Sequence, residues 1–221
     1  LEEAGDLQGA VETLKEAERL DPKDFEIHLE LGRALVSQRN YAEAEGRFRQ
    51  AVALQADSAD ARLGLANVLR MLSVLERVDA RQSDLRREAA AAYQSYLELR
   101  PGDVAASASL AGLLYSLKRY DQALEVLDRA DPAPGKEISL LDIRADIQIA
   151  QLRWDDALST LKRAIVLAPY RLDLREGLGL LYVEKKDYAA AEKELQAVLQ
   201  ADGNFVAAWK DLTTAYYLDG N

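Results

Sequence analysis

Apolar residues recur along the chain at intervals of three and four, the spacing that places them on one face of an α-helix. The clearest examples are "HLELGRAL", "REGLGLLY" and "WKDLTTAY". In each, apolar residues at i+3 and i+7 accompany a small residue at i+4, which leaves a notch where a neighbouring helix can come close. The pattern therefore predicts amphipathic helices packed closely in pairs.

A second kind of segment alternates with the first and returns at a nearly constant interval. Short turn sequences such as "RNY", "KRY", "LRW" and "KDY" lie between the two kinds. The second segments begin at Ala10, Ala44, Ala89, Ala123, Ala157 and Ala191, so their spacings are 34, 45, 34, 34 and 34 residues. The repeating unit is thus helix, short turn, helix, short turn, and one interval is 11 residues too long.

At these positions the chain resembles the tetratricopeptide repeat, whose pattern is W-x2-L-G-x2-Y, then A-x3-F, then P. The resemblance implies an all-α fold, a right-handed α-solenoid of stacked antiparallel helix pairs that runs as a single solenoid over residues 1–221. Residues 1–24 would supply a second helix only, and residues 206–221 a first helix only. The full repeats are 25–58, 59–103 (with the 11-residue insertion), 104–137, 138–171 and 172–205.

Neither end of the array has the polar character of a capping helix. Leu7, Val11, Trp209 and Tyr216 would face outward. Because a repeat cannot bury its apolar face without a neighbour, this favours a fragment of a longer array or of a multidomain protein. The alternative is a dimer contact that covers an end.

The insertion in repeat 59–103 continues an apolar stripe rather than interrupting it. Met71, Leu75 and Val78 keep helical spacing, so the first helix is expected to run to about Val78. Ser83 or Asp84 is the expected N-cap of the next helix. We therefore predict a helical spur at 71–84, with Met71, Leu75 and Val78 as a candidate secondary contact surface. A disordered loop is the alternative, and the stripe argues against it.

A second irregularity lies at 131–137. Pro132 and Pro134 cannot continue a helix, so the preceding helix should end near Ala130. The next helix then places Arg144 and Gln148 at positions where the repeat has apolar residues. We expect that helix to be rotated or tilted, with a bend at 131–137 and Arg144 half-exposed beside Asp142 or Asp146.

Composition narrows the function classes. The chain has no cysteine, which excludes disulfides and thiolate chemistry. Its net charge of −10 argues against a nucleic-acid partner, and no apolar run is long enough for membrane insertion. The single histidine, His28, occupies a helix-packing position. With no phosphate loop, paired histidines or nucleophile elbow, we expect no enzyme activity, no cofactor and no metal.

In the tetratricopeptide family the first helices line a concave groove that binds peptides or helices of other proteins. The candidate groove residues are Asn67, Arg70, Ala105, Ala108, Gly112, Tyr115, Asp142, Asp146, Ile149, Asp173 and Glu176. Leu29 and Leu63 replace the lysines of the chaperone-tail-binding members, and Asn67 stands alone where the sugar-transferase members carry an asparagine ladder. We therefore reject both subclasses.

The remaining groove has a small-residue floor and an acidic stretch. It suits a protein segment that is apolar at one end and basic at the other, although simple solvation of these helix faces is an equal alternative. Three functions follow: a non-catalytic scaffold that binds a peptide or helix, a self-association module that uses its ends or the spur to form a homo-oligomer, and a docking or regulatory arm of a larger enzyme.

Overall fold

The structure is a computed structural model that describes residues 2–130 and 137–220. Over those two ranges it contains helices and turns and no strand. The chain divides into two compact units, Leu1–Arg119 and Tyr120–Asn221, and each is described by itself.

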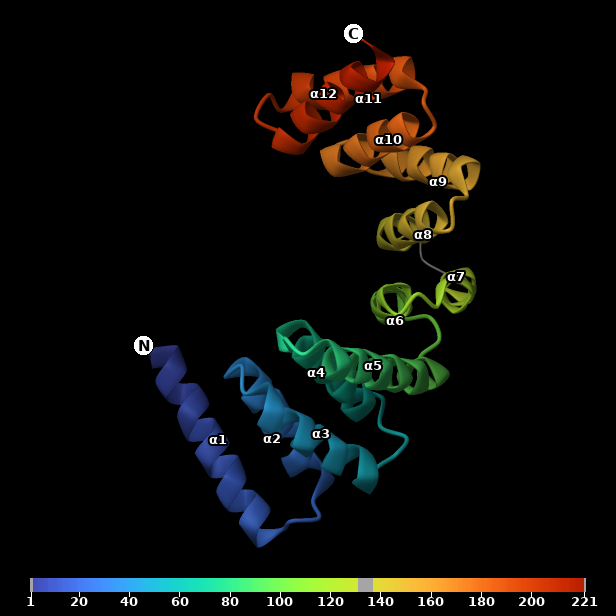
Figure 1. Cartoon of the computed structure of the whole chain (residues 1–221). Coiled ribbons are helices and arrows are strands. Elements are labelled where there is room, and N and C mark those ends of the chain that lie inside the picture. Colours follow the sequence, from blue (N-terminus) through green and yellow to red (C-terminus); the bar gives the residue numbers. More distant parts are fainter. Residues whose placement is uncertain (1, 131–136, 221) are drawn as a thin grey trace. The chain divides into compact units, whose positions relative to one another are not determined.

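The first compact unit is built from α1 to α6 (Figure 1). Its helices are α1 Glu2–Leu20, α2 Phe25–Ser37, α3 Tyr41–Leu54, α4 Ala59–Leu75, α5 Asp79–Leu99 and α6 Val104–Ser116. Helix α2 pairs with α3 and α4 pairs with α5, while α2 also contacts α4. First helices of successive repeats therefore lie next to one another.

The second compact unit is built from α7 to α12. Its helices are α7 Tyr120–Arg129, α8 Ile138–Ala150, α9 Trp154–Leu167, α10 Leu172–Glu184, α11 Tyr188–Ala201 and α12 Val206–Asp219. The pairs are α8 with α9 and α10 with α11, and α10 also contacts α12. The predicted all-α stack of helix pairs is confirmed. That the whole chain forms one right-handed solenoid stays a prediction.

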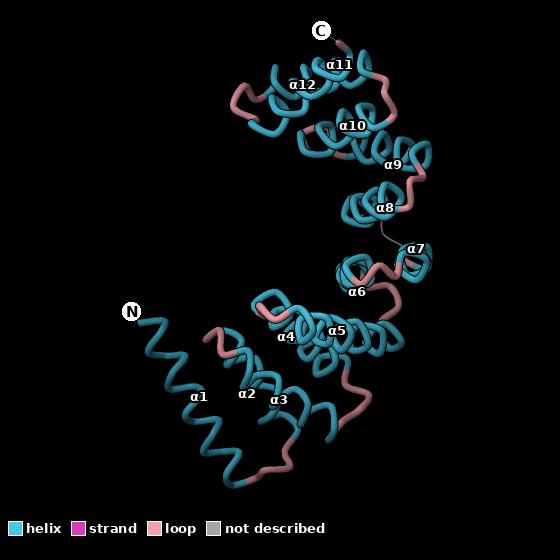
Figure 2. Tube along the Cα trace, viewed as in Figure 1, coloured by secondary structure: helices cyan, strands magenta, loops and turns pink. Residues whose placement is uncertain are grey.

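Four of the turns inside the repeats share one geometry, visible as short loops in Figure 2. Each has three residues, and the middle one has a positive φ near 60°. These residues are Arg39, Lys118, Leu152 and Lys186. The next N–H then donates back to a carbonyl of the finished helix, as from Asn40 to Leu35 at 2.8 Å, which satisfies an orphan acceptor at the helix end.

Side-chain caps fix the starts of three first helices, α2, α4 and α6. Asp24, Ser58 and Asp103 each accept a hydrogen bond from the backbone N–H three residues later. Such a cap satisfies one of the unpaired donors in the first helical turn and contributes about 1 kcal/mol. These turn residues therefore fix where α2, α4 and α6 begin, whereas α8, α10 and α12 begin without a side-chain cap.

The core of the first compact unit is organised around Phe48 of α3. Its ring is 2% exposed and lies against Gly32 of α2 and Gly64 of α4. A Cβ at position 64 would come within 2.4 Å of the ring. In the second compact unit Leu195 of α11 takes the corresponding place against Gly179 of α10. The predicted notch in the first helices is thus the point of closest helix contact.

The 11 inserted residues lengthen α4 and α5, and the turn between these two helices stays short. Helix α4 has 17 residues against 13 in α2, and α5 has 21 against 14 in α3. The predicted bounds were wrong: α4 ends at Leu75 rather than Val78, and α5 begins at Asp79 rather than near Asp84. Glu76 causes the difference, because its carboxylate accepts the N–H groups of Arg77 and Val78 and closes the turn at once.

Arg144 is half-buried, as expected, but its expected ion-pair partner was wrong. Its guanidinium donates to Asp128 of α7 at 2.5 Å rather than lying beside Asp142 or Asp146. Gln148 is buried and accepts a hydrogen bond from Thr160 of α9 at 2.7 Å. Gln148 thus occupies a packing position where the repeat has an apolar residue, and its hydrogen bond with Thr160 satisfies the buried amide oxygen. The predicted bend falls mostly on residues 131–136, which lie outside the described residues, and stays a prediction.

The contact between Phe48 and Gly64 generates a stability prediction. Gly64→Ala should lower the free energy of unfolding by about 1–3 kcal/mol, because the added methyl group overlaps a ring held on both sides. Gly46→Ala is the matched control: it lies on exposed α3 surface with nothing within 4 Å of a Cβ, so it should gain about 0.5–1 kcal/mol. Urea denaturation measures both. A Gly64→Ala variant as stable as the parent would contradict this packing.

Candidate functional site

Four of the predicted groove residues come together on the first helices of the second compact unit. Asp142 and Asp146 lie on α8, and Asp173 and Glu176 lie on α10. The structure adds Asp211 of α12, which shares a hydrogen bond with Glu176. We call these five carboxylates the acidic face.

Arg171, the residue that precedes α10, partly neutralises the acidic face. Its guanidinium donates to Asp142 Oδ2 at 2.8 Å and to Asp173 Oδ1 at 2.7 Å. These bonds bridge α8 to the start of α10. The hydrogen bond from Arg171 holds the pKa of Asp173 below its usual range, and the two carboxylates raise the pKa of Arg171. Asp142 and Asp173 are therefore already paired with Arg171, in a bridge between α8 and the start of α10.

The other acids of the face lack such compensation. Asp146 makes no ion pair within the described part of the chain, and desolvation together with the charge of Asp142 raises its pKa. Desolvation and the hydrogen bond with Asp211 raise the pKa of Glu176 to about 7. A carboxyl that keeps its proton near neutrality because an acid lies beside it is a place where a cation would be favourable.

The first compact unit carries its own hollow between α2 and α4. Asn67 Oδ1 accepts the Tyr93 hydroxyl at 2.5 Å, and Arg70 Nε donates to the same hydroxyl at 3.3 Å. Both predicted residues are thus tied to α5. Beside them lies a cavity of about 280 Å³, lined by Arg33, Val36, Phe48, Asp60, Leu63, Gly64 and Asn67.

The remaining predicted residues are placed as follows. Ala105 is exposed, whereas Ala108, Gly112 and Tyr115 are half-buried on α6. Ile149 is half-buried on α8 and packs against the core around Leu161 and Leu178. Because α4 and α6 belong to one compact unit and α8 and α10 to the other, a single groove through all of these residues stays a prediction.

The described residues also limit other kinds of chemistry. Among them, no group of three or more His, Cys, Asp or Glu side chains could hold a metal ion. No helix in the same part of the chain is long and apolar enough to cross a membrane. His28 is buried, and its Nε2 lies 2.9 Å from the Pro22 carbonyl oxygen, in a packing position.

Comparison with protein families decides what the repeat is. Models described as "Tetratricopeptide repeat" match residues 1–47, 80–147 and 148–216, and a further one matches 29–77. The chain belongs to the tetratricopeptide repeat family. Tetratricopeptide repeat proteins are generally non-catalytic and bind other proteins or peptides, so a protein-interaction scaffold is the general function that the fold supports.

One curated relative is the DnaJ homolog subfamily C member 7 homolog of Schizosaccharomyces pombe. It is 26% identical over 228 residues, which cover 98% of this chain and 47% of the relative. The chain therefore spans about half the length of that relative.

Solved tetratricopeptide structures share the fold at low identity. YrrB, described as having an unusual peptide-binding site, has a TM-score of 0.71 and 19% identity over 91% of this chain and 98% of its own. MamA from Desulfovibrio magneticus has a TM-score of 0.70 and 16% identity, over 82% and 96%. A repeat protein from Parabacteroides merdae has a TM-score of 0.68 and 19% identity, over 98% and 88%. At these identities the likeness shows the fold alone.

Sequence reasoning missed two members of this tetratricopeptide surface, Arg171 and Asp211. Arg171 is the last residue of repeat 138–171 and Asp211 lies within the final helix, and neither stands at a position where the family pattern places a groove residue. The signal for Arg171 was available: it sits two residues before Asp173, close enough for a local ion pair.

The raised pKa of Glu176 generates a pH prediction. The pKa of Glu176 is about 7 in the folded protein and 4.5 in the unfolded chain. The bound proton therefore stabilises the folded protein fully below pH 4.5, and this stabilisation is lost as the pH rises through 7. Glu176→Gln should therefore flatten the loss of stability between pH 5 and pH 8, because an amide cannot ionise. Urea midpoints at both pH values measure this. Glu184→Gln, exposed on the same helix, is the control and should keep the parental slope; an unchanged slope in Glu176→Gln would contradict the assignment.

Proposed function

We propose that this chain is a non-catalytic scaffold that binds a basic, partly apolar segment of a partner protein across the acidic face of its second compact unit. Three carboxyl groups without an ion pair among the described residues, Asp146, Glu176 and Asp211, support this proposal. Five carboxylates share one arginine there, and the protein as a whole has a net charge of −10. Clustered charge of one sign attracts a partner of the opposite sign and speeds its encounter.

An apolar row accompanies the acidic row and supports an amphipathic partner. Ile149 follows Asp146 by three residues, Leu180 follows Glu176 by four, and Leu218 follows Asp211 by seven. Residues at these spacings share one face of a helix. Leu180 is 41% exposed and Leu218 is 50% exposed, while Ile149 is half-buried.

The two rows define the chemistry of the bound segment. A segment lying across α8, α10 and α12 would place basic side chains over the carboxylates and apolar side chains over Ile149, Leu180 and Leu218. Burying apolar surface contributes about 25 cal/mol per Å², and the charges add register and specificity. A segment of acidic residues would meet like charge and be rejected.

The test uses a fluorescent amphipathic peptide of Leu and Arg, compared with the same peptide carrying Glu in place of Arg. Anisotropy should show binding of the basic peptide only. Asp146→Lys/Glu176→Lys should weaken that binding by about ten-fold or more, since two attractive contacts become repulsive. Asp142 is left unchanged because it holds Arg171.

The matched control reverses two exposed acids on second helices, Glu125→Lys/Asp155→Lys. It makes the same change in net charge and should bind the basic peptide within about two-fold of the parent, because long-range screening removes most of a distant charge effect. Equal weakening by both double variants would show that net charge alone matters and would overturn the assignment of the acidic face.

A further inference from the structure

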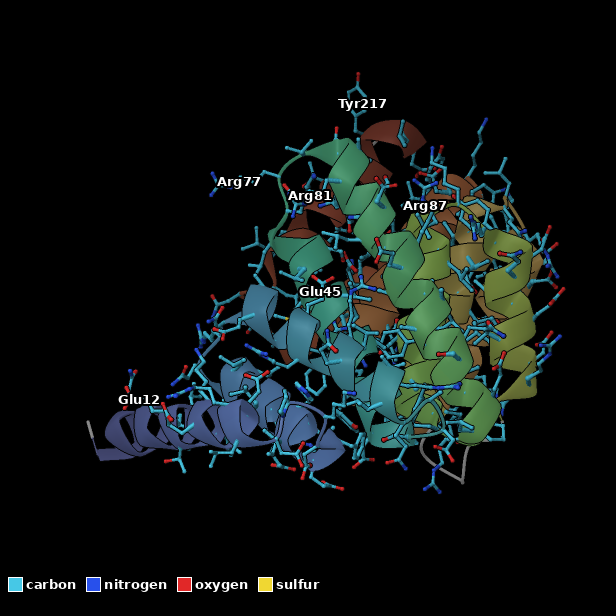
Figure 3. All side chains as sticks on the ribbon, turned by 90° about the horizontal axis from the view of Figure 1, so that it is seen from below. Glu12, Glu45, Arg77, Arg81, Arg87 and Tyr217 are labelled. Atoms are coloured by element: carbon cyan, nitrogen blue, oxygen red, sulfur yellow. The ribbon has the colours of Figure 1, made fainter. Side chains whose placement is uncertain are left out.

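The turn between α4 and α5 presents an apolar surface that nothing in the first compact unit covers. Val74 is 66% exposed, Leu75 is 57% exposed and Val78 is 60% exposed, all within five residues. Arg77 and Arg81 flank them, and Figure 3 shows Arg77 extending away from the ribbon. We call these five residues the spur tip.

The positive charge of the spur tip is available to a partner. Arg77 makes no ion pair within the described part of the chain, because Glu76 is occupied elsewhere: it accepts two backbone N–H groups and contacts Arg81 Nε at 3.1 Å. Arg81 itself remains 75% exposed. Residues 74–81 carry Glu76 and Asp79 as well as the two arginines, so the segment is neutral as a whole, and Arg77 is its arginine without an ion pair among the described residues.

The spur tip is also held in a defined shape. Both Oε1 bonds of Glu76 fix the turn, and Gln82 Nε2 donates to the Glu76 carbonyl oxygen at 3.2 Å. Hydrogen bonds to an ionised carboxylate are among the stronger ones in proteins. A contact surface that is ordered before binding loses less conformational entropy when it docks.

We propose that the spur tip of one copy docks onto the acidic face of a second copy of this chain. The two surfaces are complementary in both respects: arginines oppose the uncompensated Asp146 and Glu176, and Val74, Leu75 and Val78 oppose the row of Ile149, Leu180 and Leu218. The proposal rests on the proposed function, because it names the spur tip as one basic, partly apolar segment that the acidic face accepts.

The geometry of such a contact has a consequence for assembly. Donor and acceptor are different surfaces, so the interface is heterologous, and each pair of copies keeps one free spur tip and one free acidic face. Association should therefore continue beyond a dimer with rising concentration unless a ring closes. It should also weaken with added salt, because the opposed charges are exposed.

Sedimentation velocity of the full chain between about 1 and 200 µM tests this, since weak interfaces have micromolar dissociation constants. The parent should show a rising sedimentation coefficient. Arg77→Glu/Val78→Ser should weaken association by about ten-fold or more, and serine is a favourable N-cap for α5. Val74→Ser is a second variant that leaves the turn unchanged and should also weaken association. Lys23→Glu/Val166→Ser, which makes the same changes at exposed sites elsewhere, should associate like the parent.

Mixing gives the decisive result. Arg77→Glu/Val78→Ser keeps an intact acidic face, and Asp146→Lys/Glu176→Lys keeps an intact spur tip, so neither should self-associate but together they should form a complex. A parent that stays monomeric throughout, or a mixture that forms no complex, would overturn the proposal. If the monomeric parent still binds the basic peptide, only self-docking fails; if the peptide does not bind either, the proposed function fails with it.

Discussion

Close approach of paired helices at glycine is the constraint on which the rest of this structure depends. Phe48 lies between Gly32 and Gly64, and Leu195 lies against Gly179. In the first compact unit one side chain of a second helix thus contacts the first helices of two successive repeats. The position of each pair is therefore set by the pair before it, and first helices are brought side by side. Helices α10 and α12, which are in contact, carry three of the five carboxylates of the acidic face.

The sequence predicted most helix starts because the turns are local. Tyr41, Tyr120, Trp154 and Tyr188 begin second helices, as the turn pattern indicated. The spur turn was mispredicted because its geometry comes from the Glu76 carboxylate and the Gln82 amide, which no hydrophobic periodicity reveals. The polar run "DARQS" forms the exposed start of α5, and for that reason it has no apolar stripe. Its alanine, arginine and glutamine have high helix propensity, and this propensity correctly indicated a helix.

The candidate site was predictable in part for a related reason. Periodicity places a residue on a face of its own helix, so Asp142, Asp146, Asp173 and Glu176 could be assigned to one surface. It does not give the distance between side chains of successive repeats. The bridge from Arg171 to Asp142 joins the two ends of repeat 138–171, and the pairing of Glu176 with Asp211 crosses between successive repeats. Because of these contacts, Arg171 neutralises Asp142 and Asp173, whereas the other acids of the face have no basic partner among the described residues. The position of a residue in the sequence does not reveal this difference.

Unpaired carboxylates on one surface carry an electrostatic cost that a repeat array can sustain, because its stability comes from apolar contacts between neighbours elsewhere. Desolvation and the neighbouring Asp211 raise the pKa of Glu176 to about 7, so a retained proton removes part of that cost near neutral pH. A docked arginine or lysine would remove the same repulsion in a different way, by replacing the proton with a fixed positive charge. If a basic partner binds at this face, proton and partner would compete for one carboxyl pair, and binding would be linked to proton release.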